Sequence, residues 1–254
     1  MGGVSFMDMV KERVALISGI NDEIGRAIAV RFAKKGAKVV VMGDNQKNLD
    51  ALTSDNMALG GNIEKVVVDS NNSKEIHRAV GGVLDRFGRI DILVNNADNS
   101  SACGICNMTD DNWHQSMDNL DPMFFLCREV IPVMQEKKYG RVININDLDY
   151  IGWPGKANYS AAKSAIFGFT RSIALEVAKD NITVNCVVKG DIRSADMTDE
   201  DVEKAAARLP VKKLGTPEDV AMAVGFFASD TSPYTTGQTL FVCGGKSMYF
   251  SMSI

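Results

Sequence analysis

The stretch VALISGINDEIG, residues 14–25, decides the fold class. Residues 14–17 form a short, continuously apolar run, which predicts a buried strand, and residues 24–35 have the apolar spacing of an amphipathic helix. A glycine-containing turn, residues 18–25, joins the two. The N-terminus of the helix would offer backbone N–H groups and the positive end of its dipole to an anion.

The same succession of strand, turn and helix continues along the chain. Further strands are predicted at 38–42, 66–68, 90–94, 141–145, 182–187 and 239–242, and helices near 46–59, 73–87, 111–137 and 157–179. Continuous apolar strands that alternate with helices are typical of a parallel sheet covered on both faces. We therefore expect an α/β fold, a doubly wound parallel sheet of the Rossmann type, with residues 1–254 as one domain.

Composition excludes several classes of protein. The chain is 45% hydrophobic with a formal net charge of −4, so it carries no basic footprint for nucleic acid. No apolar run approaches the ~18 residues of a transmembrane helix. Residues 1–6 match neither a signal peptide nor a myristoylation pattern, and we expect a cytoplasmic protein.

The five cysteines are scattered and odd in number, which argues against a disulfide framework. Cys103 and Cys106 have C-x-x-C spacing, but no second pair or nearby histidine completes a metal site. We expect no metal and two reduced thiols in a loop.

Tyr159 and Lys163 are the strongest candidates for catalysis. Residues four apart lie on one face of a helix, so the ammonium would lie beside the phenol. A cation lowers the free energy of the phenolate, and Tyr159 could then exchange a proton with an alcohol near neutral pH. The pair alone is a weak signal, which the rest of the chain strengthens.

Together these features resemble the short-chain dehydrogenase/reductase family over nearly the whole chain. The motifs that carry the resemblance, in the family's order, are the glycine turn, Asp69, Asn95-Asn96-Ala97, Asn119, Tyr159 with Lys163, Leu214-Gly215-Thr216-Pro217-Glu218-Asp219-Val220 and Thr236-Gly237-Gln238. The C-terminal motifs are similar to the 3-oxoacyl-carrier-protein reductase branch.

The resemblance implies a nicotinamide cofactor and hydride transfer between it and a carbonyl or alcohol carbon. Tyr159 would be the general acid and base, Lys163 would lower its pKa and hold the nicotinamide ribose, and Asn119 would support a water that leads protons to solvent. Asp69 would reach the adenine, and Asn95 would steady the central strands and the cofactor.

Two sets of site residues follow from the resemblance. The catalytic set is Tyr159, Lys163, Asn119 and Asn146. The cofactor-binding set is Gly19, Asn21, Ile24, Gly25, Asp44, Asp69, Asn95, Ala97, Tyr159, Lys163, Lys189, Gly190 and Ile192.

The sequence departs from the family at Glu23, where the third glycine of the turn is expected. A carboxylate about 4 Å from a phosphate would cost roughly 4 kcal/mol at an effective dielectric near 20. Alternatively, Glu23 only stabilises the first turn of its helix, as carboxylates do there.

The family's catalytic serine is also missing. Counting from Gly140 places Asp147 at that position, and counting back from Tyr159 places Asn146 there. Asn146 could donate a hydrogen bond to a substrate oxygen, whereas an ionised Asp147 would repel a developing oxyanion.

Two further departures lie near the site. Asp98 replaces a glycine that passes close to the cofactor, and Lys189 replaces the proline before Gly190. Lys189 is either a solvated loop residue or a cation that reaches the pyrophosphate or pairs with Glu23.

Cofactor preference is read at the end of the second strand. Gly43 and Asp44 occupy the positions that select the adenine ribose, and no arginine is present for a 2′-phosphate. This favours NAD(H) over NADP(H).

Three hypotheses about function remain open. The first is an NAD(H)-dependent oxidoreductase acting on a carbonyl or secondary alcohol. The second is a non-catalytic member, such as a regulatory protein or a subunit that stabilises an active paralogue. The third is an eliminase or isomerase that uses Tyr159 as its base.

The remaining expectations concern substrate and assembly. Residues 191–209, rich in acidic side chains, would fold over the substrate as a short helical lid, and Cys103, Cys106, Trp153 and Met197 could line the pocket. The family forms tetramers through the helices near 111–137 and 157–179, so we expect a homotetramer, a small-molecule substrate, and neither nucleic acid nor membrane as a partner.

Overall fold

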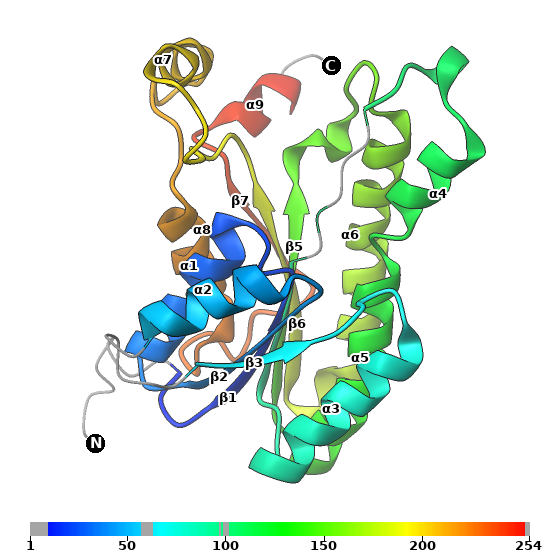
Figure 1. The fold of residues 1–254 in the computed structure, drawn as a ribbon, viewed down its shortest axis with the longest axis vertical. Helices are drawn as coiled ribbons and strands as arrows, with labels where there is room; N and C mark the ends of the chain where they lie inside the picture. The colour runs from blue at the N-terminus through cyan, green and yellow to red at the C-terminus, as the bar shows by residue number, and fades with distance from the viewer. Residues whose placement is uncertain (1–9, 57–62, 97, 99–101, 252–254) are drawn as a thin grey trace.

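The computed structural model describes residues 10–56, 63–96, 98 and 102–251. Within these residues, a parallel sheet of seven strands runs in the order β3-β2-β1-β4-β5-β6-β7 (Figure 1). The strands are β1 Val14–Ser18, β2 Lys38–Gly43, β3 Ile63–Val67, β4 Ile92–Asn95, β5 Gly140–Asp147, β6 Ile182–Lys189 and β7 Thr239–Val242. This confirms the predicted doubly wound Rossmann-type sheet; the assignment of the whole chain to one domain stays a prediction.

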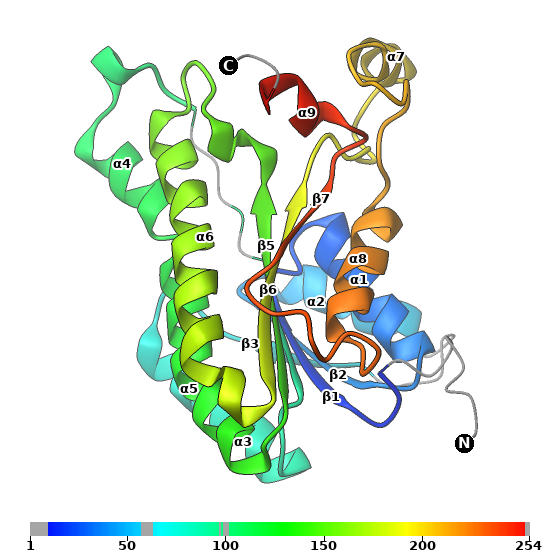
Figure 2. The same cartoon turned by 180° about the vertical axis from the view of Figure 1, so that it is seen from behind.

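Helices cover both faces of the sheet (Figures 1 and 2). Helices α1, α2 and α8 lie on one face, and α3, α5 and α6 on the other. Their bounds are α1 Glu23–Lys34, α2 Gln46–Asn56, α3 Ser73–Phe87, α4 Asp110–Met117, α5 Asp121–Lys137, α6 Ala157–Val177, α7 Asp199–Ala207, α8 Pro217–Ala228 and α9 Lys246–Ser251.

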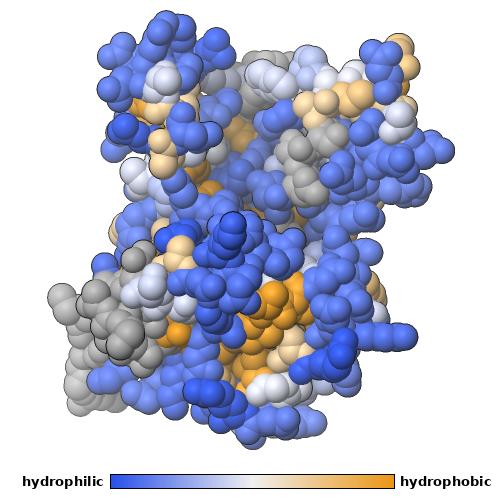
Figure 3. Space-filling view, viewed as in Figure 1, coloured by the Kyte–Doolittle hydropathy of each residue, from blue (hydrophilic) through white to orange (hydrophobic). Residues whose placement is uncertain are grey.

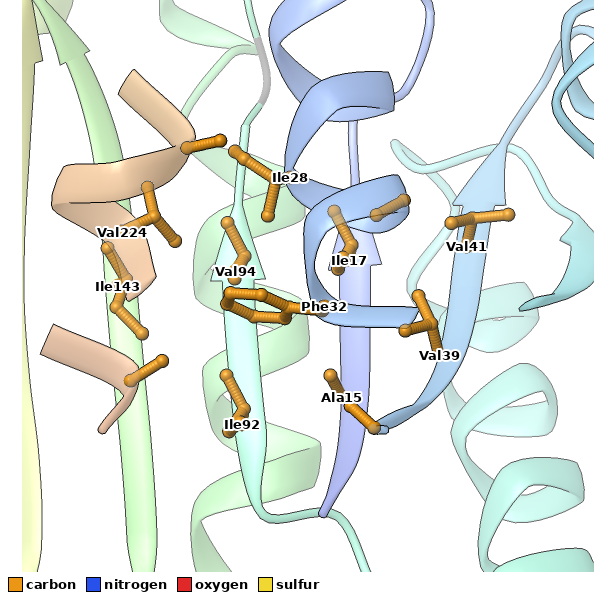
Figure 4. Packing of buried hydrophobic residues seen from close by; sticks show 14 of the residues in the cluster. Ala15, Ile17, Ile28, Phe32, Val39, Val41, Ile92, Val94, Ile143 and Val224 are labelled. Carbon is orange, nitrogen blue, oxygen red and sulfur yellow. The ribbon is translucent and has the colours of Figure 1, made fainter. Parts of the chain in front are cut away.

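The core on the α1 side shows why these segments pack as they do. Phe32 of α1 is 1% exposed and lies among Ile92, Val94 and Val39 of the central strands (Figure 4). Val224 of α8 completes this layer beside α1 (Figure 4). Every residue of β1 is buried, which explains why the strand appears in the sequence as a continuous apolar run up to its last residue, Ser18.

Two predicted elements differ from the structure. The third strand begins at Ile63 rather than at 66, because an edge strand alternates buried and exposed residues and so lacks a continuous apolar run. The predicted helix over 111–137 is two helices, since the chain breaks after Met117 and restarts with Pro122 in the first turn of α5.

The strand order reverses between β1 and β4, which places a crevice at their carboxyl ends. Helices α4, α7 and α9 rise around that end of the sheet (Figure 1). Helix α7 lies within the segment 191–209 that is predicted to cover the substrate. None of the described helices is long and apolar enough to cross a bilayer.

Candidate active site

A cleft of about 500 Å³ lies at the carboxyl ends of the strands, beside the reversal in strand order. Figure 3 shows this face hollowed between the lobe that carries α7 and the lobe that carries α4. The cleft is lined by Ser18, Gly19, Asn21, Asp22, Gly43, Asp44, Ser70, Asn71, Asn96, Asp98, Gln115, Asp118, Asn119 and Pro122. Four of these described residues are aspartates and none is a lysine or arginine.

The turn after β1 has the geometry that its glycines predict. Gly19 has φ +69°, and a Cβ on Gly25 would lie 2.7 Å from the Gly19 carbonyl oxygen, so only glycine fits there. Asp22 caps α1, and its carboxylate accepts a hydrogen bond from the Gly25 N–H at 2.8 Å. Burial raises the pKa of Asp22 above its usual value. A carboxylate of this chain therefore already takes one N–H group of the helix N-terminus.

Glu23 binds the segment that carries α7. Its Oε1 accepts a hydrogen bond from the Ala195 N–H at 3.0 Å, and Glu23 is not among the residues that line the cleft. The hypothesis that Lys189 pairs with Glu23 is wrong, because the Lys189 ammonium contacts Asp98 and Asp147 instead.

The far end of the cleft carries the residues that would select the ribose. Asn21 donates a hydrogen bond to the Asp44 carboxylate at 3.0 Å, so both predicted residues meet there. Asp69 closes its own turn by accepting the Asn71 N–H at 3.0 Å and does not line the cleft. Ser70 and Asn71 line the cleft in its place, which the sequence did not indicate.

Two asparagines after β4 hold the centre of the sheet. Asn95 is 1% exposed and donates to Asn144 Oδ1 at 2.8 Å, which ties β4 to β5. Asn96 donates to the Gly19 carbonyl at 2.6 Å and to Asp22 at 2.9 Å, and so holds the glycine turn. Asn96 was not among the predicted site residues. Ala97 lies outside the described residues.

Tyr159 and Lys163 lie one turn apart on α6, as predicted, and both are almost fully buried. They converge on the carboxylate of Asp98. Tyr159 Oη donates to Asp98 Oδ1 at 2.7 Å, and Lys163 Nζ lies 3.2 Å from the same oxygen.

Lys189, at the end of β6, closes the same network. Its ammonium lies 3.1 Å from Asp98 Oδ2 and 2.5 Å from Asp147 Oδ2. Asp147 ends β5 and is the cross-strand neighbour of Lys189, which explains their contact. Two departures from the family pattern, Asp98 and Asp147, thus both contact a third, Lys189.

These contacts control ionisation in the site. Burial opposes the charge on Asp98, but the ammonium groups of Lys163 and Lys189 outweigh it and hold the Asp98 pKa well below its usual value. Burial, and then the Asp98 charge, raises the pKa of Tyr159 far above its usual value, so the expectation that Lys163 lowers this pKa is wrong for the arrangement in which Asp98 binds both side chains. Burial lowers the pKa of Lys189, but Asp98 and Asp147 raise it by more, so Lys189 stays charged.

Asn146 does not occupy the position that was predicted for it. It is fully buried, donates to the Lys163 carbonyl at 3.0 Å and accepts the Asp147 N–H at 2.9 Å. Its carboxamide is therefore bonded to the backbone, and Asp147 is the side chain that reaches the site. Asn119 lines the cleft as expected and donates to the Ser116 carbonyl at 3.0 Å.

The last predicted cofactor residues support neighbouring elements. Gly190 donates to the Val242 carbonyl at 2.9 Å, and a Cβ there would lie 2.7 Å from the Cβ of Cys243. Ile192 bridges to Gly215, and Ile24 is buried in the core. Gly190, Ile192 and Ile24 are not among the described residues that line the cleft.

The residues predicted to line the substrate pocket are not among those that line this cleft, and their role there stays a prediction. Cys103, Cys106, Trp153 and Met197 do not line the cleft in the described part of the chain. Trp153 is half exposed, and the Lys246 ammonium lies 5.9 Å from the centroid of its ring.

The two ends of the site fit a dinucleotide differently. The glycine turn and the Asn21–Asp44 pair fit an adenosine half, because Gly19 lines the cleft and a carboxylate is available there for a ribose hydroxyl. At the other end, the groups that would hold the nicotinamide ribose are already bound to Asp98. The residues therefore fit one half of NAD(H), and Asp98 would have to move for the other half.

Comparison with known proteins places this site among related enzymes. A sequence model for a family described as enoyl-(acyl carrier protein) reductase matches residues 19–247. Subunit BbsC of (2S)-[(R)-hydroxy(phenyl)methyl]succinyl-CoA dehydrogenase from Thauera aromatica is 44% identical over 243 residues, covering 95% of this chain and 97% of the relative. Subunit BbsD of that dehydrogenase is 36% identical, covering 94% and 98% of the two chains.

Two further proteins are similar to this chain over most of its length. The 3-oxoacyl-[acyl-carrier-protein] reductase FabG of Vibrio cholerae is 38% identical, covering 93% of this chain and 98% of the relative. A crystal structure from Burkholderia xenovorans, described as a short-chain dehydrogenase/reductase, has a TM-score of 0.89 and 33% identity, with 94% and 98% of the chains covered. These relatives support a dehydrogenase or reductase role.

Proposed function

Because the chain belongs to the short-chain dehydrogenase/reductase family, we propose that it transfers a hydride between NAD(H) and a carbonyl or secondary alcohol substrate. One observation carries the proposal: Tyr159 and Lys163 converge on one point at the carboxyl end of the sheet. The point is now held by the Asp98 carboxylate; once Asp98 has moved, the phenol and the ammonium can exchange a proton with an alcohol oxygen there.

The residues of the site have separate tasks in this proposal. NAD(H) supplies or accepts the hydride, and Tyr159 Oη gives the proton to the substrate oxygen or takes it. The Lys163 ammonium lies 5.2 Å from the centroid of the Tyr159 ring, and Asn119 lies at the cleft wall where a proton path would reach solvent. Asn146 is not carried into the proposal, since its carboxamide is bonded to the backbone.

The preference for NAD(H) over NADP(H) rests on the ribose end of the cleft. Asp44 and Asn21 lie there, and the described lining contains no lysine or arginine to bind a 2′-phosphate. A carboxylate at this position favours a free 2′-hydroxyl.

A second function, that of a non-catalytic subunit, is favoured by Asp98. Its carboxylate engages Tyr159, Lys163 and Lys189 together, and four aspartates line the cleft. Two relatives are named as subunits of one dehydrogenase, which gives this alternative a precedent. In that case the chain would stabilise an active paralogue.

Titration of NADH fluorescence separates the two functions. Saturable binding in the micromolar range supports catalysis, and absence of binding at millimolar NADH and NADPH leaves the subunit role. Turnover, once a substrate is found, should be lost in Tyr159→Phe. A Tyr159→Phe variant that retains turnover would remove this residue from the mechanism.

Glu23→Gly tests the cofactor end of the cleft. It removes a carboxylate from the first turn of α1 and releases Ala195. If the parent binds NADH poorly, we expect the variant to bind it more tightly, because Glu23, although it does not itself line the cleft, adds a negative charge next to Asp22, which does. Equally poor binding would contradict this electrostatic interpretation.

For assembly, we propose a cytoplasmic homotetramer that packs through the outer faces of α5 and α6. Phe124 of α5 is 45% exposed and Leu175 of α6 is 83% exposed, and apolar side chains this large favour burial against another copy. Light scattering with the purified chain measures the state directly; a monomer at micromolar concentration would contradict the proposal.

A further inference from the structure

Three donors surround the two oxygens of the Asp98 carboxylate. The Tyr159 hydroxyl and the Lys163 ammonium meet one oxygen at 2.7 and 3.2 Å, and the Lys189 ammonium meets the other at 3.1 Å. The Lys163 side chain is 2% exposed and that of Lys189 16%, so the donors are largely removed from water. This arrangement is how a protein binds a carboxylate ligand.

Lys189 is held in position by Asp147 as well as by Asp98. Asp147 binds its ammonium at 2.5 Å, and the other oxygen of Asp147 accepts the Asp149 N–H at 2.8 Å. The cross-strand pairing of β5 and β6 places Asp147 and Lys189 side by side. Removal of the Asp98 side chain would therefore leave the Lys189 donor in position.

The charges of the network balance only when Asp98 is present. Two ammonium groups, Lys163 and Lys189, face two carboxylates, Asp98 and Asp147. Without Asp98, two largely buried ammonium groups, Lys163 and Lys189, face the single carboxylate of Asp147, and this excess of buried positive charge is unfavourable. A small anion that enters the vacated position restores the balance.

We propose that Tyr159, Lys163 and Lys189 form a carboxylate-binding site whose resident ligand is the side chain of Asp98, and that a free monocarboxylate replaces it when that side chain is removed. In this site Lys189 binds the second oxygen of Asp98, and Asp147 holds Lys189 in place. The proposal goes beyond hydride transfer, because it concerns what fills the site whether or not the chain is catalytic.

Formate is the probe, and thermal unfolding followed by circular dichroism is the measurement. Formate has three non-hydrogen atoms, which limits its dissociation constant to roughly 1 mM or weaker. Asp98→Gly is titrated to about 100 mM formate against chloride at constant ionic strength. The expected result is a formate-specific, saturating rise in Tm, as mass action requires for a ligand of the folded state.

Three comparisons sharpen the test. The parent and the control Asp85→Ala, which removes an exposed carboxylate on α3, should show no rise specific to formate. Asp98→Gly combined with Lys189→Met should lose most of the rise. If Asp98→Gly does not fold in chloride, Asp98→Ala and refolding yield in formate are measured instead.

The proposal is overturned if formate and chloride affect folded Asp98→Gly equally, or if the parent gains as much from formate as the variant does. It is also overturned if neither Asp98 variant folds in formate. Because none of these measurements involves a nicotinamide or turnover, failure here is distinguishable from failure of the hydride-transfer proposal.

Discussion

Replacement of Lys189 by methionine tests whether the network at the carboxyl ends of β5 and β6 holds the fold together. The lysine lies between two carboxylates, Asp98 at 3.1 Å and Asp147 at 2.5 Å. Methionine has a similar length and no charge, so the change removes the cation with little change in volume. Two largely buried carboxylates then lose a shared partner.

The expected loss of stability follows from these distances and exposures. At 3.1 Å and an effective dielectric near 20, the gross attraction between Lys189 and Asp98 is about 5 kcal/mol, much of it offset by desolvation. Removal of one partner of a buried pair costs about 3–5 kcal/mol. Because Asp98 is 23% exposed, we expect the lower end, about 3 kcal/mol. For a chain of this size that corresponds to a fall in Tm of roughly 6–12 °C.

Urea unfolding followed by circular dichroism, at one fixed protomer concentration, measures this free energy. Lys74→Met on the exposed surface of α3 is the matched control and should change stability by less than about 0.5 kcal/mol. In an Asp98→Asn background the cost of Lys189→Met should fall, because one of the stranded carboxylates is gone. A loss under about 1 kcal/mol, or an equal loss in both backgrounds, would mean that Lys189 does not stabilise the fold through these two carboxylates.

Three further predictions follow from burial and charge. The folded-state pKa of Asp98 is depressed, so its contribution to stability is present above about pH 4 and is lost as pH falls toward that lower pKa; Asp98→Asn should lose less stability between pH 4 and pH 2, which acid unfolding curves measure. Burial raises the pKa of Cys127 and of Cys186 to about 12, whereas Cys106 is exposed. A thiol reagent at pH 8 should therefore modify Cys106 in the native protein and the other two only after unfolding, and mass mapping that finds them modified in the native state would contradict this. Phe32→Ala opens a cavity between α1 and the sheet and should cost about 3–5 kcal/mol in urea unfolding; a cost under about 1 kcal/mol would mean that the site repacks.

Elements that depend on neighbouring residues could be predicted from the sequence alone. Helix α3 begins and ends where predicted, because Asn72 caps its first turn and Gly88 adopts the left-handed conformation after it. The glycine turn and the spacing of Tyr159 and Lys163 were equally readable, since both depend only on neighbouring residues. Continuous apolar runs identified the central strands. The edge strand β3 was predicted to start too late, because it alternates buried and exposed residues and has no continuous apolar run.

The contents of the site depend on contacts between strands and could not be predicted from the sequence. Adjacent residues of a strand point to opposite faces, so only one of Asn146 and Asp147 can face the site. Counting residues along the chain gave both positions and did not show which one faces it. The register of β5 on β6 then set Asp147 beside Lys189, and the pairing of β4 with β5 brought Asp98, which follows β4, within reach of Lys189. Contacts among residues about 40 to 90 positions apart depend on strand register and order, which no local pattern encodes.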